Sequence, residues 1–308
     1  MCTDNDTEVT VILLLGFRNL NNPKIPLFIL FLFIYTVILC GNILIIFLVT
    51  FNQHLQIPMF FFLKHLGVNL SKRLADVLFT TSTIPMMLHI ILNEEIIVTL
   101  FGCLCQLYLY GLSSVQCFLL AVMSYDRYLA ICFPLHYISL MGPNVCLLLV
   151  FGSWLSVFVL VTTEIILLSQ LHSCGFQQID HFFCDFGPLA ALSTSDTSVL
   201  MLVDFIISIS MISLPFILVI GTYVCIFITI FKMNSKTGRQ KMFSTRSSHL
   251  TVVCTYYGTL IIVYMGPTGE NAHDLKKFLS LLYIVIAPFM NPIIYSLRNK
   301  DIRENILM

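Results

Sequence analysis

The side chains in this sequence that could do chemistry are the few charged or strongly polar ones inside long apolar runs. Asp126 and Arg127 stand together at the end of one run, and Asp76 and Asn291 lie within two others. Such groups are costly in apolar surroundings unless they pair, reach a membrane boundary or have a function. A solvated helix end is the alternative for Asp126-Arg127. No nucleophile motif accompanies them, so we do not expect an enzyme, and we expect no metal or cofactor.

The composition predicts a membrane protein. The 308 residues are 58% hydrophobic and 10% charged, whereas a soluble domain carries about 25% charged residues. The net charge is zero, and nothing in it indicates nucleic-acid binding. A chain of this length has room for six to eight helices of about 20 residues that cross a lipid bilayer.

Seven apolar stretches divide the chain. We expect each to be a membrane-spanning helix, and none alternates as a strand does, so a β-barrel is not expected. The two halves show no internal repeat, which counts against a transporter. The stretches cover about 26–50, 58–92, 100–127, 145–167, 199–232, 249–265 and 278–297.

Basic residues set the expected orientation, because they collect on the cytoplasmic side. They fall between the fifth and sixth stretches and after the seventh: Lys232, Lys236, Arg239, Lys241, Arg246, Arg298, Lys300 and Arg303. Residues 1–25 should then be extracellular and 298–308 a cytoplasmic tail. Asn5-Asp6-Thr7 is a glycosylation acceptor on the outer side. The acidic start is unlike a cleavable signal peptide, so the first span should direct membrane insertion.

The string Met123–Tyr137, MSYDRYLAICFPLHY, carries a family resemblance. It resembles the MAYDRYVAICHPLHY signature of odorant receptors, a branch of the rhodopsin-like G-protein-coupled receptors. Further matches cover nearly the whole chain: PMFFFL at 58–63, IDHFFCD at 179–185, KMFSTRSSHL at 241–250 and PFMNPIIYSLRNK at 288–300. The resemblance implies an all-α, seven-transmembrane helix bundle with its N-terminus outside and a short C-terminal amphipathic helix.

The resemblance also implies a cytoplasmic switch. In the family the Arg at position 127 pairs with Asp126 in the inactive state and meets the G protein in the active state. The partner would be a heterotrimeric G protein of the stimulatory, olfactory type, which raises cyclic AMP. The residues expected to form the switch are Asp126, Arg127, Tyr128, Tyr223, Asn291, Pro292 and Tyr295.

Two further sites follow from the resemblance. Asp76, Gln116 and Asn291 would line a small polar cavity that can hold sodium, weakened because the family has an acid where this chain has Gln116. A Cys103–Cys184 disulfide would tie the third span to the long outer loop. Cys174 would then be a free thiol, because its usual partner position is Thr194.

A ligand pocket is expected where the outer halves of the third, fifth, sixth and seventh spans converge. Its wall would be mostly apolar with a few hydroxyls and no ionisable residue. Such a pocket suits a small, uncharged, volatile ligand and suits an amine poorly. Ordinary helix packing is the alternative for each apolar member. The expected residues are Tyr110, Ser113, Ser114, Ile207, Met211, Tyr257, Leu260, Ile261, Tyr264 and Ile284.

Two departures from the family pattern bear on function. Asn69–Leu74 resembles an insertion in the second span and brings Lys72 and Arg73 into apolar sequence. Each would cost about 2.5–3.5 kcal/mol at mid-bilayer, so we expect the helix to protrude, or a bulge from which both side chains reach water or phosphates. The interval between Gln106 and Gln116 is one residue short, which rotates the outer segment by about 100° unless a distortion absorbs it.

Three functions remain open on the sequence. The main interpretation is an odorant receptor in the plasma membrane. A transporter or channel would need broken helices with paired ionisable residues at mid-membrane. The third possibility is a non-functional or poorly trafficked relic of a receptor.

Overall fold

A computed structural model describes residues 11–16, 24–51, 59–171, 177–232, 249–262 and 273–298. The side chains of residues 48–66, 273–276, 287 and 291–298 are outside that description. The expected C-terminal helix, Asn5, Cys174 and Tyr264 lie outside the described residues altogether, and so does the loop between the fifth and sixth spans.

Seven apolar helical segments follow one another in the predicted order. The first, second and fourth spans are α1 (Lys24–Phe51), α2 (Met59–Asn93) and α6 (Pro143–Ser169). The third span consists of α3 (Leu100–Leu112) and α4 (Val115–Cys132), followed by the short α5 (Tyr137–Leu140). The fifth is α8 (Ser198–Phe231), the sixth is the helix His249–Ile262, and the seventh is α10 (His273–Arg298). The predicted seven-helix bundle is confirmed.

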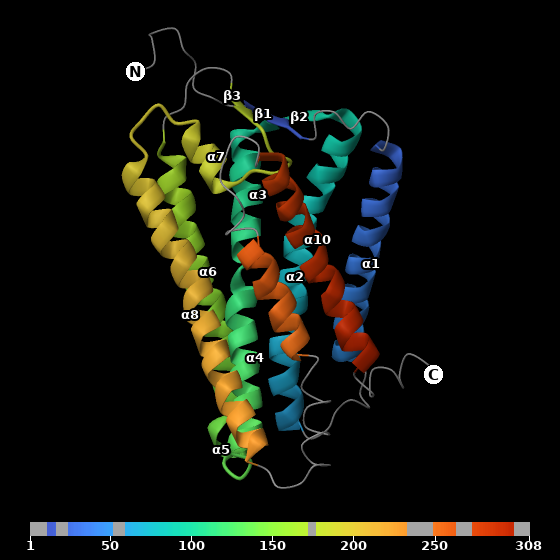
Figure 1. Cartoon of the computed structure of the whole chain (residues 1–308), viewed down its shortest axis with the longest axis vertical. Coiled ribbons are helices and arrows are strands. Elements are labelled where there is room, and N and C mark those ends of the chain that lie inside the picture. Colours follow the sequence, from blue (N-terminus) through green and yellow to red (C-terminus); the bar gives the residue numbers. More distant parts are fainter. Residues whose placement is uncertain are drawn as a thin grey trace.

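The helices run side by side along the long axis, and the third span lies among the others (Figure 1). α4 packs against α2, α6 and α8, while α1 packs against α2 and α10. Large apolar side chains such as Phe33 of α1, Phe151 of α6 and Phe205 of α8 point outward and are exposed. An apolar surface of this extent is unusual for a soluble monomer and fits contact with lipid chains.

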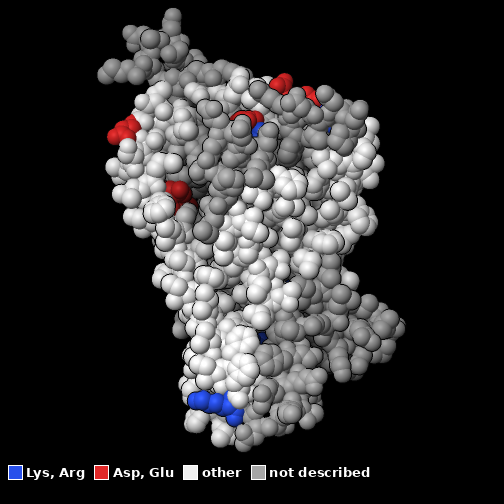
Figure 2. All heavy atoms as spheres, in the orientation of Figure 1, with Lys and Arg blue, Asp and Glu red and all other residues white. Residues whose placement is uncertain are grey.

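A small sheet lies at one end of the bundle, which we call the outer end (Figure 1). β1 (Val11–Leu15) pairs antiparallel with β2 (Glu95–Thr99) and parallel with β3 (Gln177–Ile179). Ile12 and Leu14 are fully buried. The three strands lie outside the seven apolar stretches, and the sequence analysis did not predict them, because each strand is short and its partners lie far away in sequence. On the face shown in Figure 2, acidic atoms gather near this end with small basic areas beside them, and the largest basic area lies at the opposite, inner end.

The third span is interrupted where the sequence is one residue short. Ser114 N donates to Gly111 O at 3.0 Å and Gln116 N to Ser113 O at 3.1 Å, so the chain bonds over three residues instead of four. A turn of about 3.0 residues rotates about 20° further per residue than a turn of about 3.6. A short run of such bonds therefore recovers most of the about 100° that the missing residue would have added.

The second span absorbs its extra residues without a bulge. α2 is one helix of 35 residues, which is about 52 Å long and exceeds a hydrocarbon core of about 30 Å. Lys72 and Arg73 are only 1% and 2% exposed, so the predicted bulge with both side chains reaching water or phosphates is wrong. Their charges point into the bundle, where polar partners are present.

Candidate functional site

A cavity of about 200 Å³ lies in the outer half of the bundle. Its wall comes from the third span, α6, α8, the sixth and seventh helices and the start of α7 (Phe186–Ala191). An apolar cavity of about 150 Å³ is large enough for benzene, so this one admits a small organic molecule. The lining residues are Leu107, Tyr110, Gly111, Ser113, Ser114, Cys117, Val161, Glu164, Ile165, Asp185, Phe186, Gly187, Asp204, Ser208, Met211, Ile212, Tyr256, Leu260 and Tyr283.

Three carboxyl groups line this cavity. Glu164 comes from α6, Asp204 from α8, and Asp185 is the residue before α7. Asp185 Oδ1 accepts a hydrogen bond from Phe186 N at 2.9 Å. Burial raises the pKa of Asp185, and the bond from Phe186 N opposes that shift. The expected wall without an ionisable residue is therefore wrong.

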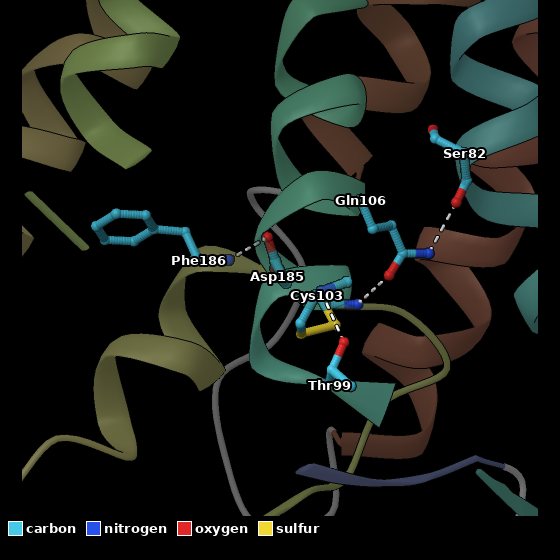
Figure 3. The surroundings of a disulfide bond; sticks show 8 residues. Ser82, Thr99, Cys103, Gln106, Asp185 and Phe186 are labelled. Carbon is cyan, nitrogen blue, oxygen red and sulfur yellow. Dashed lines mark hydrogen bonds between the residues drawn. A yellow bond between two sulfur atoms is a disulfide. The ribbon is translucent and has the colours of Figure 1, made fainter. Parts of the chain in front are cut away.

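A disulfide fixes the loop that carries Asp185. Cys103 of α3 is bonded to Cys184 with their Cα atoms 5.5 Å apart, as predicted. Figure 3 shows Gln106 beside this bond, one turn along α3: its Oε1 accepts from Cys184 N at 2.9 Å and its Nε2 donates to Ser82 O at 2.8 Å. These contacts hold α2, α3 and the loop together, so the position of Asp185 is set by covalent and polar contacts on both sides.

The seventh span also contacts the sheet at the outer end of the bundle. Lys277 of α10 is 4% exposed and donates to Asp180 Oδ1 at 2.6 Å and to Gly16 O at 3.3 Å. Gly16 follows β1, and Asp180 follows β3. One ammonium group therefore joins α10 to the sheet that covers the outer end.

A polar cluster lies inside the bundle around α2. Arg73 Nη1 donates to Asn42 Oδ1 of α1 at 3.1 Å and lies 3.8 Å from Asp76 Oδ2. Asp76 also attracts the Lys72 ammonium, which Arg73 repels. Asn42 and Asp76 are fully buried. The cationic groups beside Asp76 are thus supplied by the chain itself, from the residues that looked like an insertion.

The residues of the expected switch lie at the inner end. Asp126 is 7% exposed and accepts a hydrogen bond from Tyr137 Oη of α5 at 2.9 Å. Burial raises the pKa of the Tyr137 phenol, and the Asp126 carboxylate raises it further. Arg127 is partly exposed. The pairing of Asp126 with Arg127 in the inactive state stays a prediction; Tyr137 is one partner of Asp126 in this structure.

The fifth and sixth spans meet at the same end. Tyr223 Oη of α8 lies 2.5 Å from His249 Nδ1, and both side chains are buried. Further out on the same helix, Tyr256 Oη lies 3.3 Å from Cys117 Sγ of α4, and both residues line the cavity. The sixth helix therefore has one polar contact at the cavity and another at the inner end.

Comparison with known proteins decides the family. A family model described as olfactory receptor matches residues 31–308. Human olfactory receptor 10A7 is 42% identical over 98% of this chain and 94% of its own length. Human olfactory receptor 6N1 is 40% identical, and mouse olfactory receptor 5P55 is 42% identical. Each of these two matches covers 99% of this chain and 96% of the relative's own length. The chain belongs to the olfactory receptor family.

Olfactory receptors are G-protein-coupled receptors and not enzymes, and they are multi-pass proteins of the plasma membrane. The family membership decides against a transporter or channel. It also agrees with the apolar, membrane-length helices of the bundle.

The receptor's cavity contains five of the ten expected pocket residues. Tyr110, Ser113, Ser114, Met211 and Leu260 line it; whether they bind ligand stays a prediction. Four others do not line it. Ile207, Tyr257 and Ile284 are buried in helix packing, and Ile261 is 44% exposed on the outer surface of the bundle. The sixth helix turns Tyr256 to the cavity, one residue away from the expected Tyr257.

The rest of the expected site is distributed as follows. Gln116 is buried on α4 and Tyr128 is partly buried near the inner end. Asn291, Pro292 and Tyr295 lie on α10, with side chains outside the description. Sodium binding at the polar cavity stays a prediction. In this structure the Arg73 guanidinium lies beside the Asp76 carboxylate.

Sequence reasoning missed Glu164 and Asp204, although a signal was present. Each is the single acidic residue of its apolar stretch. The rule that an ionisable residue inside a span is a functional candidate applies to both, as it was applied to Asp76. Tyr137 and His249 were also missed, since their roles depend on partners from other spans.

Proposed function

We propose that this receptor binds a small, volatile molecule with an apolar body in the outer cavity and activates a stimulatory G protein, raising cyclic AMP. The observation that supports this proposal most directly is that the sixth helix has contacts both at the cavity and at the inner end of the bundle. It contributes Tyr256 and Leu260 to the cavity, and His249, at its inner end, contacts Tyr223. A ligand that displaces Tyr256 from Cys117 can therefore move the helix whose other end faces the G protein.

The switch is assigned to the motif residues at the inner end. Asp126, Arg127, Tyr128 and Tyr223 would contact the G protein or rearrange with it, together with Asn291, Pro292 and Tyr295 of α10. Tyr137 would stabilise the inactive state by its hydrogen bond to Asp126. Pro215, inside α8, and Pro292 would let the two helices bend, because each removes a backbone hydrogen bond.

The test is a cyclic AMP reporter assay of the epitope-tagged full chain against a panel of volatile compounds, with surface staining of the same cells. We expect a dose-dependent response to some compounds in the parent chain and none in Arg127→Ala at equal surface staining. The matched control is Lys232→Ala, which removes an exposed cation from the inner end of α8.

Two results would separate the alternatives. A chain that stays inside the cell would be the poorly trafficked relic. If the parent chain reaches the surface and the variant Arg127→Ala signals as well as the parent, the assignment of the switch is overturned.

A further inference from the structure

The ionisable side chains that line the ligand cavity are all acidic. Glu164, Asp185 and Asp204 come from three separate elements, and the described lining residues include no Lys, Arg or His. The ion pairs within the described residues involve none of these carboxylates. Asp204 repels Glu164 on one side and Asp185 on the other. The cavity is thus a place where negative charges gather without a cation from the described part of the chain.

Like charges near one another and away from bulk water are mutually unfavourable. A cation in the cavity would remove that repulsion. The carboxylates do not converge on one point, since no group of three His, Cys, Asp or Glu side chains that could hold a metal ion occurs in the described part of the receptor. Two of them can still approach one ammonium group, whose three N–H donors point in different directions.

A second feature of the wall points to a polar ligand. Ser114 Oγ is buried and has no hydrogen-bond partner within the described residues, whereas Ser113 Oγ donates to Tyr110 O at 2.5 Å. Buried hydroxyls are nearly always hydrogen-bonded. Ser114 lies in the interrupted turn of the third span and lines the cavity, so a ligand N–H group is a natural partner for it.

The remaining wall is apolar and suits the rest of such a molecule. Val161, Ile165, Met211, Ile212 and Leu260 line the same space. With a volume of about 200 Å³ against about 150 Å³ for a benzene site, the cavity admits an alkyl or aryl group of about six carbons.

We propose, on the basis of the ligand cavity assigned above, that the receptor is selective for small organic cations, such as primary alkylamines. Asp204 and Glu164 bind the ammonium group, with Asp185 near it. Ser114 accepts one of the N–H donors, and the apolar residues hold the hydrocarbon part. This reverses the expectation that the pocket suits an amine poorly.

The test compares primary alkylamines of four to eight carbons with alcohols and carboxylic acids of the same chain lengths, in the cyclic AMP assay of the full chain. Hydrogen bonds to charged groups correspond to about a 10- to 100-fold change in affinity. We therefore expect amines to act at concentrations at least about 10-fold lower than the alcohols. Asp204→Asn and Glu164→Gln should each shift the amine curves by a similar factor and leave the weaker alcohol responses in place.

Asp196→Asn is the matched control, because Asp196 is an exposed acid of the outer loop and does not line the cavity. A second measurement needs no G protein. Hexylamine should raise the melting temperature of the purified full chain more than hexan-1-ol at the same concentration, and the difference should be lost in Asp204→Asn.

The outcomes separate this inference from the proposed function. Responses to alcohols with no preference for amines, and unchanged in Asp204→Asn, would overturn the cation selectivity and leave the odorant receptor intact. Amine-selective stabilisation without cyclic AMP would support the cation site and contradict the proposed coupling. Equal melting temperatures with both compounds would overturn the inference whatever the signalling result.

Discussion

Replacing Arg73 with methionine should destabilise the receptor strongly. The change removes the guanidinium that lies 3.8 Å from Asp76 and donates to Asn42, and it leaves a carboxylate that is fully buried. At this separation the attraction is about 4 kcal/mol for an effective dielectric constant of 20. Breaking a buried pair costs about 3–5 kcal/mol in measured cases. Because Lys72 also attracts Asp76, we expect a loss at the lower end, about 3 kcal/mol.

The assay is surface staining of the tagged chain together with the melting temperature of the purified protein. Arg73→Met should lower surface staining several-fold and lower the melting temperature by several degrees. The double variant Arg73→Met, Asp76→Asn should recover most of the loss, since replacing both members of a buried pair is often neutral. Leu74→Met, at an exposed neighbouring position, is the control.

A single variant Arg73→Met that matches the parent in both measurements would refute the reasoning. It would mean that Arg73 and Asp76 do not stabilise one another in the bundle. A double variant no better than the single one would show that the loss comes from packing and not from charge.

Three other predictions concern the two ends of the receptor. Peptide mapping without reduction should recover Cys103 linked to Cys184, and Cys184 linked to another cysteine would contradict the pairing. Replacing either cysteine with serine should reduce surface staining, because loss of a native disulfide costs about 2–5 kcal/mol. Tyr137→Phe should raise basal cyclic AMP because it removes the hydroxyl that donates to Asp126, and Asp126→Asn should also raise it because a neutral amide replaces the charged acceptor of that hydrogen bond; unchanged basal signalling in both variants would show that this contact does not stabilise the inactive state. Tyr223→Phe should reduce the maximal response at normal surface staining, since it removes the hydrogen bond to His249; a response equal to that of the parent would assign this bond a packing role only.

The helices could be predicted from the sequence because each span is an apolar run of membrane length. α6 and α8, for example, begin within two residues of their predicted starts. The Cys103–Cys184 bond was available from the family resemblance alone. The sheet was not, because Ile12 pairs with Val98 and Gln177, and nothing local in the sequence specifies partners at such distances.

The residues of the candidate site could be predicted only where their positions follow from spacing along a single helix. Counting along the third span placed Tyr110 and Ser114 correctly at the cavity. The sequence marks Glu164 and Asp204 as the single acids of their apolar stretches, but it does not show that they face the cavity, because that depends on how α6 and α8 rotate against α4. The charges of α2 were misjudged for the same reason: Asn42, on another helix, accepts from Arg73, so the predicted cost of burial is offset by a tertiary contact.

The central claim, that the outer cavity is the ligand site that controls signalling, is tested most directly by filling it. Ser114→Leu adds an apolar group where Ser114 lines the cavity, and Ser156→Leu adds the same group at an exposed position of α6. The measurement is the cyclic AMP dose response of both variants to compounds that activate the parent, at matched surface staining. The account predicts at least a 10-fold loss of potency (about 1.4 kcal/mol) for Ser114→Leu and no change for Ser156→Leu. Parent-like responses from Ser114→Leu would contradict it.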